Sequence, residues 1–310
     1  MSQSPQQDDA IVPRLEESAE MRPLVSIIMA VRNGAETIGP AVRSIQLQTL
    51  RDWELIVIDD GSTDASPSIV RTFSDARIRL TCETSSAGLA TRLNQAVALS
   101  RGAFIARMDA DDVCFPDRLA RQVDRLQQEP RLDVLGCGAV VFDSAARLLG
   151  ELPVGLTHEE ITAQPFHGFP FPHPTWCGRA EWFRKHPYDP RLMKTQDQDL
   201  LLRTFKVSYF ATLDEVLMGY RQDTLDLAKM LLGRRVFIGS LWRYARRSGE
   251  FLPALGGIVT HLLKSAADVT IIGLGLNRLS QRNRLKPVRP AVAKQWQELQ
   301  LRLGLSGEAG

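Results

Sequence analysis

A cluster of carboxylates is the feature of this sequence best suited to chemistry. Asp109, Asp111 and Asp112 place three acids within four residues, directly after the apolar segment 103–105. An apolar run that ends abruptly in acids is typical of a buried strand whose carboxyl end opens into a crevice, where open α/β sheets bind ligands. Carboxylate oxygens there suit a hard cation, Mg²⁺ or Mn²⁺, and through it a phosphate-bearing ligand. A solvated acidic turn is the alternative, because short motifs often match by chance.

Repeated strand and helix patterns surround this cluster and would position it. The predicted strands are 24–30, 54–58, 77–81, 103–107 and 134–142, and the predicted helices are 36–49, 88–99, one through Ile69 and Val70, and one that begins at Pro116. Such cycles with short loops predict a doubly wound, mostly parallel α/β sheet. Asp59 and Asp60 end the second strand, so two acidic loops should flank one crevice. Asp-Gly-Ser also forms turns without any ligand.

Later segments combine polar residues with turns and a helix start. Residues 166–176 are rich in aromatics, Pro and Gly, which predicts either a binding loop or a loop that only packs. Asp197 and Asp199 precede a Leu-rich helix, where an acid stabilises the helix by about 0.5–2 kcal/mol without any catalytic role. Residues 209–212 and 216–220 are predicted as two short strands.

Six segments in a fixed order carry a family resemblance over roughly residues 24–222. They are VSIIMAVRNGAETI, SIQLQTLRDWELIVIDDGSTD, IARMDADD, FPDRLARQV, HPTWCGR and QDQDLLLR. Together they resemble the inverting family 2 glycosyltransferases of the nucleotide-binding GT-A fold, of the bacterial surface-polysaccharide type. The resemblance implies a metal-dependent enzyme that moves a sugar from a nucleotide-diphosphate sugar to a hydroxyl of an acceptor glycan, which is expected to be lipid-linked.

The resemblance also implies roles for individual residues on the donor side. The expected positions are Ala30, Val31 and Asn33 packing on the nucleotide, Asp60 bonding its base, Asp109 meeting the ribose and the cation, Asp111 holding the cation, and Arg221 at the diphosphate. Carboxylates plus substrate phosphates are a usual environment for Mg²⁺, in agreement with this assignment. The family commonly has other residues at the positions of Ala30 and Arg32, so the identity of the nucleotide is not carried over.

On the acceptor side, the resemblance places His173 and Thr175 at the border of the site, with Arg179 following them. It makes Asp197 the general base that removes the acceptor proton. Gln196 stands where the family has a Glu, which changes only the residue beside the base.

Composition and the extent of the resemblance together divide the chain into a polar lead-in (1–22), an expected GT-A domain (23–225) and a basic helical segment (226–310). The net charge of +2 hides +10 in residues 228–310 against −8 in the rest, which suggests an anionic partner for the basic part. The lead-in lacks the basic start and apolar core of a secretory signal. Four scattered cysteines predict reduced thiols in a cytoplasmic protein.

The helix predicted from Pro253 has two interpretations. Its apolar residues recur at helical spacing: Leu255, Ile258, Leu262, Ala266, Val269, Ile272 and Leu276. His261, Lys264 and Asp268 argue against a spanning helix, whereas the surrounding arginines favour an anionic surface at the inner face of the plasma membrane. A helical pair packed on the catalytic domain or on a second subunit gives the same pattern.

Two rival functions stay open at this stage. A nucleotidyltransferase could use the same metal crevice, although the first strand lacks a Gly-rich phosphate loop. A basic nucleic-acid-binding protein is disfavoured, because the basic segment has few interleaved aromatics beyond Trp242 and Tyr244; no nucleic-acid partner is therefore expected.

Overall fold

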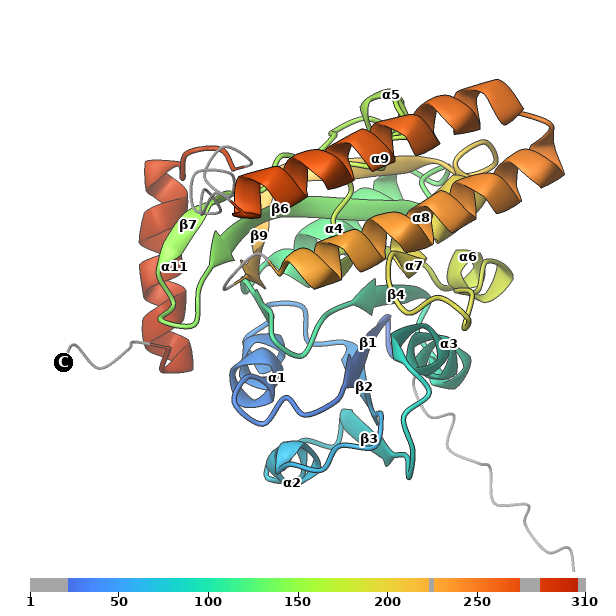
Figure 1. Cartoon of the computed structure of the whole chain (residues 1–310). Helices are drawn as coiled ribbons and strands as arrows, with labels where there is room; N and C mark the ends of the chain where they lie inside the picture. The colour runs from blue at the N-terminus through green and yellow to red at the C-terminus, as the bar shows by residue number, and fades with distance from the viewer. Residues whose placement is uncertain (1–21, 223–225, 274–284, 306–310) are drawn as a thin grey trace, which may run out of the picture.

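The computed structural model describes residues 22–222, 226–273 and 285–305, which form a mixed α/β structure around one curled sheet (Figure 1). Most of the predicted lead-in lies outside the described residues. The strands are β1 (Val25–Val31), β2 (Trp53–Asp59), β3 (Ile78–Cys82), β4 (Phe104–Arg107), β5 (Val113–Cys114), β6 (Val134–Phe142), β7 (Leu148–Glu151), β8 (Cys177–Arg179) and β9 (Phe210–Arg221). They lie in the order β3-β2-β1-β4-β8-β6-β9-β5, and β7 pairs with β6.

The first half of the sheet is parallel, as the sequence predicts. Strand β1 pairs in parallel with β2 and β4, and β2 pairs in parallel with β3. Every residue of β2 is buried, which is typical of a parallel strand covered on both faces. The carboxyl ends of β1, β2 and β4 therefore meet at one edge, where the acidic loops begin.

Helices connect and cover these strands. They are α1 (Ile38–Gln46), α2 (Ser66–Arg71), α3 (Leu89–Leu99), α4 (Arg118–Gln128), α5 (His158–Ile161), the 3₁₀ turn η1 (His173–Thr175), α6 (Ala180–Lys185) and α7 (Gln196–Thr204). In α1 the buried apolar side chains are Ile38, Ala41, Val42 and Ile45, a spacing that puts them on one face. The predicted helices are present, with ends shifted by a few residues.

The second half of the sheet is mixed and corrects one expectation. Strand β8 is antiparallel to β4 and β6, whereas β9 runs parallel to β6. The two strands predicted at 209–212 and 216–220 are one strand, β9, with register shifts opposite Gly138. A side-chain carbon at Gly138 would lie 3.0 Å from the carbonyl oxygen of Glu215. Glycine there lets the irregular part of β9 approach β6 without breaking the strand.

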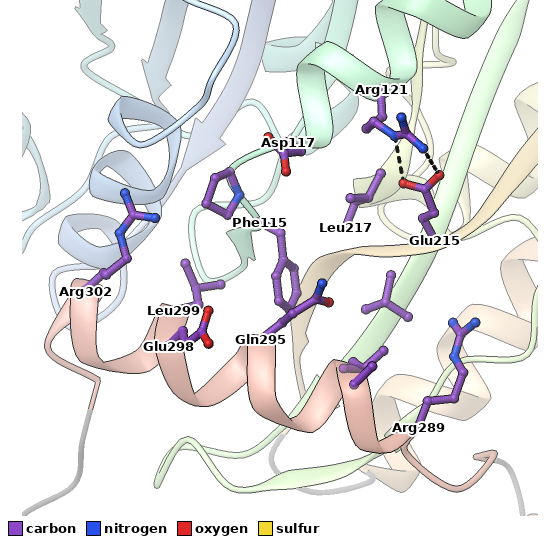
Figure 2. A pocket seen from close by; sticks show the side chains of 14 residues that line it. Phe115, Asp117, Arg121, Glu215, Leu217, Arg289, Gln295, Glu298, Leu299 and Arg302 are labelled. Carbon is purple, nitrogen blue, oxygen red and sulfur yellow. Dashed lines mark hydrogen bonds and ion pairs between the residues drawn. The ribbon is translucent and has the colours of Figure 1, made fainter.

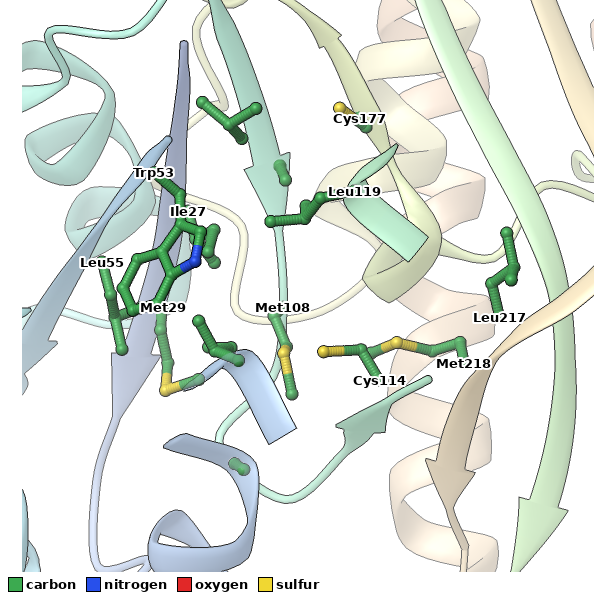
Figure 3. Close-up of a cluster of buried hydrophobic side chains, with 14 of the residues drawn as sticks. Ile27, Met29, Trp53, Leu55, Met108, Cys114, Leu119, Cys177, Leu217 and Met218 are labelled. Atoms are coloured by element: carbon green, nitrogen blue, oxygen red, sulfur yellow. The ribbon is translucent and has the colours of Figure 1, made fainter. Parts of the chain in front are cut away.

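Apolar side chains from the sheet and from α1 and α4 form the main core (Figure 3). Met29, Leu55 and Met108 belong to this core, and all three are almost completely buried. Burying each such side chain stabilises the fold by about 1.5–3 kcal/mol. Cys114 and Cys177 pack in the same core as small apolar groups, and the cysteines are free thiols. This core holds the strand ends in fixed positions.

The C-terminal segment packs at two separate places. Helices α8 (Leu227–Ser248) and α9 (Phe251–Gly273) form an antiparallel hairpin beside α7, and α11 (Pro290–Leu303) lies at the other end of β6 (Figure 1). Trp296 of α11 is buried against the rings of Phe115 and Phe142, with centroids 6.3 and 4.7 Å away. Leu276 of the predicted stripe lies outside the described residues, as do three of the arginines that surround it in the sequence, Arg278, Arg282 and Arg284. The domain boundary at 226 stays a prediction.

A groove of about 550 Å³ lies beside α11. Figure 2 shows Phe115, Leu217 and Leu299 at its floor and the Arg121–Glu215 ion pair at its edge. The groove shares no lining residue with the cavities described below. The volume of a cavity alone therefore does not show which one is the functional site.

Candidate active site

The loop after β4 gathers the three predicted carboxylates. Ligand oxygens of Asp109, Asp111 and Asp112 all lie within 4.8 Å of one another. Desolvation and the charge of Asp109 raise the pKa of Asp111 to about 6, and the same causes, with Asp111 added, raise the pKa of Asp112. One oxygen of Asp112, Oδ2, is buried without a hydrogen-bond partner among the described residues. Crowded carboxylates with an unsatisfied oxygen fit a divalent cation, which these residues can hold.

A cavity of about 360 Å³, here called the β1 cavity, joins this cluster to the end of β1. Its lining residues are Ala30, Val31, Arg32, Asn33, Gly34, Thr37, Asp109, Ala110, Asp111 and Arg221. Six of the residues predicted for the donor side therefore meet in one place. Arg221 donates from its backbone N–H to Asp112 Oδ1 at 2.8 Å and from Nε to the Asp111 carbonyl at 3.2 Å. Its cationic head is thus held beside the acidic loop.

The loop at the end of β1 is locked to the loop after β2. Asn33 has a φ of +53°, its N–H donates to Ser62 Oγ at 2.9 Å, and its Oδ1 accepts from the Thr63 N–H at 2.9 Å. The Gly34 N–H donates to Ser66 Oγ at 2.8 Å. In the sequence, Ser62 is predicted only as part of a turn and Ser66 has no predicted role, because their partners lie 29 and 32 positions away in the chain. These bonds give the β1 cavity a preformed wall.

Asp60 holds a third loop in place. Its Oδ1 accepts from the Ala87 N–H at 2.7 Å and from Arg92 Nε at 2.6 Å, and its Oδ2 accepts from Ser86 Oγ and the Gly88 N–H. These four bonds use about all the acceptor capacity of a carboxylate and hold the pKa of Asp60 below its usual value against the effect of burial. The predicted bond to a base would have to replace one of these contacts, and it stays a prediction.

A second cavity, here called the α7 cavity, has a volume of about 530 Å³. It lies between the 169–174 loop, the start of α7 and the end of β9, and its lining includes Arg107, Asp109, His173, Gln196 and Asp197. Asp109 lines both this cavity and the β1 cavity. The carboxylate cluster therefore lies where the two cavities meet.

Asp197 and Asp199 have different surroundings, which separates their roles. Asp199 is buried in ion pairs with Arg203 at 2.8 Å and Arg243 at 3.4 Å. Asp197 faces the α7 cavity, and the one hydrogen bond found for its carboxylate among the described residues comes from Gln198 Nε2 at 3.2 Å. Burial raises the pKa of Asp197, while Arg107 acts to lower it. Asp197 is thus the carboxylate free to accept a proton from a molecule in this cavity.

Arg107 is a site residue that the sequence analysis missed. It lies at the end of β4, is almost completely buried, and pairs through Nη2 with Asp109. Its Nε and Nη1 have no hydrogen-bond partner among the described residues. Because buried N–H groups are rarely left unsatisfied, Arg107 is placed to bind a ligand between Asp109 and Asp197. From the sequence alone, Arg107 was predicted only as the last residue of the strand 103–107.

The three residues predicted for the acceptor side differ in where their side chains lie. His173 lines the α7 cavity, with Nε2 2.7 Å from the Tyr188 hydroxyl, and burial holds the pKa of His173 well below its usual value. Thr175 is completely buried, and its hydroxyl donates to the Pro172 carbonyl. The guanidinium of Arg179 donates to the carbonyls of Leu132, Leu126 and Glu129. The structure therefore corrects the assignment of Thr175 and Arg179, which stabilise the fold away from the cavity.

Comparison with known proteins decides the family. The sequence model described as Glycosyl transferase family 2 matches residues 26–186, just over half of the chain. The chain belongs to glycosyltransferase family 2. The predicted family and the glycosyltransferase activity are thereby confirmed.

Relatives and solved structures of glycosyltransferases agree with this assignment. The putative glycosyltransferase EpsE of Bacillus subtilis is 34% identical over 213 residues, which are 65% of this chain and 74% of EpsE. The Escherichia coli enzyme WfgD, named as a UDP-Glc:alpha-D-GlcNAc-diphosphoundecaprenol beta-1,3-glucosyltransferase, is 39% identical over 103 residues, which are 33% of this chain and 41% of WfgD.

The fold is shared with enzymes solved with nucleotide sugars. S. aureus TarS 1–349 in complex with UDP-GlcNAc superposes with a TM-score of 0.59 at 15% identity, covering 90% of this chain and 80% of that one. The mannosyltransferase PcManGT from Pyrobaculum calidifontis, in complex with GDP-Man and Mn²⁺, gives 0.56 at 20% identity, covering 93% and 86%. These likenesses confirm the GT-A type of α/β fold for this glycosyltransferase.

Proposed function

We propose that this glycosyltransferase moves a sugar, with inversion, from a nucleotide-diphosphate sugar to a hydroxyl of an acceptor glycan. The observation that carries the proposal is the position of Asp109, which lines both the β1 cavity and the α7 cavity. A donor in the β1 cavity would place its diphosphate at the carboxylate cluster and Arg221. Its sugar would then point into the α7 cavity, where Asp197 lies. UDP-GlcNAc in TarS and GDP-Man in PcManGT support this class of donor.

The chemistry follows from the residues on either side of the sugar. Asp197 takes the proton from the acceptor hydroxyl as its oxygen attacks the anomeric carbon. The bond from that carbon to the diphosphate oxygen breaks in the same displacement, so the configuration inverts. Arg221 and Arg107 stabilise the charge that develops on the leaving diphosphate. A bound Mg²⁺ or Mn²⁺ held by Asp109, Asp111 and Asp112 would supply further neutralisation of that charge.

Nucleotide-sugar binding is the first expected result. A thermal-shift screen of UDP-, GDP- and dTDP-sugars with Mn²⁺ or Mg²⁺ should find at least one that stabilises the protein. At 100 times its dissociation constant, a ligand raises the free energy of unfolding by about 2.7 kcal/mol. No shift with any nucleotide sugar, together with a shift and pyrophosphate release with a nucleoside triphosphate, would instead favour a nucleotidyltransferase.

The exposed face of α9 supports a place at an anionic membrane surface. Ala254, His261 and Asp268 face α8, and Asp268 pairs with Arg234. The apolar residues of the predicted stripe that point to solvent include Leu255 and Leu262, and beside them Leu252 is 82% exposed. Among the described residues, Phe251–Ile272 is the helix long and apolar enough to cross a membrane, with a mean hydropathy of 1.3. The polar residues on its packed side favour lying on the surface over crossing it.

This arrangement refines the two interpretations of the tail. The hairpin does pack on the domain through α8, whose Phe237, Leu241 and Ala245 are buried, and it also leaves an apolar face uncovered. Arg246 and Arg247 are exposed at the end of α8, and Arg247 also lines a small cavity beside α7. Arg243, by contrast, binds Asp199 and Ser240. The acceptor is then proposed to be a lipid-linked glycan in bacterial polysaccharide synthesis, as the name of WfgD gives for that relative.

Vesicle binding tests the membrane proposal. The protein should bind anionic vesicles at low salt, weaken at high salt without complete release, and bind neutral vesicles poorly. Replacing Arg246 and Arg247 with Gln should weaken binding about 30-fold, since each cation near an anionic surface contributes on the order of 1 kcal/mol. Replacing both Leu255 and Leu262 with Ser should remove the vesicle binding that persists at high salt. If neither pair changes vesicle binding, α9 does not contact lipid.

A further inference from the structure

A third cavity lies beside the catalytic carboxylate. This α8 cavity has a volume of about 340 Å³ between α8, α9, the 167–168 loop and the start of α7. Lys194, Thr195 and Gln198 line both this cavity and the α7 cavity. The segment that carries Asp197 therefore forms a common wall between them. A molecule with its reacting hydroxyl at Asp197 could extend directly into the α8 cavity.

The lining of the α8 cavity is cationic. Among the residues that the structure describes, Lys194, Lys229 and Arg234 line it and no carboxylate does. No ion pair with another described residue is found for Lys194, and Lys229 lies 3.8 Å from Asp226 on the exposed side of α8. Arg234 uses Nε and Nη2 to bind Asp268, which orients its guanidinium between the two helices. An anion entering this space would meet three cations, while Asp268 binds Arg234 and Asp226 acts on both lysines from outside the lining.

His261 gives an independent indication that the cavity holds a ligand. Its side chain lines the cavity, is only 7% exposed, and packs edge-on against Phe237 with ring centroids 5.1 Å apart. Neither ring nitrogen makes a hydrogen bond of good geometry to another described residue, although the backbone of Phe166 lies close enough to act on the pKa of the ring. Burial, with the charges of Lys264 and Arg234, lowers the pKa of His261 to about 4. At neutral pH the ring is therefore uncharged and offers one N–H donor that a ligand oxygen would satisfy.

We propose that the α8 cavity binds a phosphate or diphosphate group carried by the acceptor, through Lys194, Lys229, Arg234 and His261. This inference rests on the proposed function, because it takes the acceptor hydroxyl to lie at Asp197. The acceptor would then be a phosphorylated glycan. Its phosphate would lie in the α8 cavity while its hydroxyl reacts at Asp197 in the α7 cavity. The same chemistry could come from a phospholipid headgroup, so the test must separate the two sources.

Isothermal titration with inorganic pyrophosphate in EDTA tests this site directly. EDTA removes divalent cations, so the carboxylate cluster does not attract the probe. Wild-type protein should bind pyrophosphate, and Lys194→Gln with Lys229→Gln should weaken binding about tenfold or more, because charge-assisted hydrogen bonds are lost. Neither lysine belongs to a buried ion pair, so the fold should survive. His261→Phe, which keeps the packing on Phe237 and removes the ring nitrogens, should weaken binding as well.

A matched pair of charges serves as the control. Arg235→Gln with Arg246→Gln removes two exposed cations from the same hairpin, and neither residue lines the cavity. These changes should leave pyrophosphate binding intact and weaken binding to anionic vesicles, whereas the Lys194 and Lys229 changes should do the reverse. No pyrophosphate binding by the wild type, or equal loss in both pairs, overturns the proposal. If the Lys194 and Lys229 variant loses vesicle binding but keeps pyrophosphate binding, the cavity binds a lipid headgroup and the acceptor proposal is overturned.

The titration needs no turnover, so it is independent of the transfer reaction. A failed donor screen with intact pyrophosphate binding would remove the proposed function and leave the anion site. Nucleotide-sugar binding without any pyrophosphate binding would leave the proposed function intact and rule out the anion site.

Discussion

Asp197→Asn is expected to reduce sugar transfer by about 10² to 10⁴, the usual cost of losing a general base, with nucleotide-sugar affinity kept. The carboxylate faces the α7 cavity with Gln198 as its hydrogen-bond partner, so its replacement breaks no ion pair. Because burial raises the pKa of Asp197, the proton-accepting form is lost at a higher pH than for an exposed aspartate. The wild-type kcat/KM should therefore fall as the pH is lowered through that pKa.

Asp199→Asn is the matched control for this prediction. It removes the buried partner of Arg203 and Arg243, so it should lower the melting temperature and leave the chemical step largely intact in the folded fraction. Steady-state kinetics and thermal unfolding of both variants separate the two effects. A mild Asp197→Asn beside a kinetically severe Asp199→Asn would mean that the two roles are reversed.

Asp111→Asn should abolish turnover at ordinary Mn²⁺ or Mg²⁺ concentrations while the protein stays folded. Three carboxylates with ligand atoms within 4.8 Å of one another form the site, and removing one charge weakens the attraction for a divalent cation. Titration with Mn²⁺ should show the loss of affinity independently of activity. Asp124→Asn, which changes an exposed carboxylate on α4, should bind Mn²⁺ as the wild type does. Full transfer activity in EDTA would contradict a metal-dependent mechanism.

The sequence predicts the parallel half of this fold well because short apolar runs and helical spacing are local signals. The acidic loops fall at strand ends for the same reason, and β6 has the predicted bounds 134–142. The continuity of β9 was missed because it depends on Gly138, more than 70 positions away, which accommodates the irregular stretch at Asp214 and Glu215. Asp214 and Glu215 suggested a turn between two strands, but pairing with β6 keeps this stretch within one strand.

Side-chain direction explains the errors within the site. Thr175 and Arg179 follow His173 closely in sequence, but η1 and β8 turn their side chains into the fold. Arg107 was overlooked because the sequence pattern of a strand does not indicate whether the side chain of its last residue reaches a cavity. For α9, periodicity located a helix but not the packed face, because Arg234 on α8 neutralises Asp268 and lets a polar face pack.

The most direct test of the central claim is product analysis with the nucleotide sugar selected by the thermal-shift screen, labelled in its sugar and supplied with Mn²⁺ and a bacterial membrane glycolipid extract. The wild type should release nucleoside diphosphate and transfer labelled sugar in equal amounts, with the anomeric configuration inverted when the product is examined by NMR. Asp197→Asn should form neither product above the background. Retained configuration, or undiminished transfer by Asp197→Asn, would contradict a single displacement with Asp197 as the base.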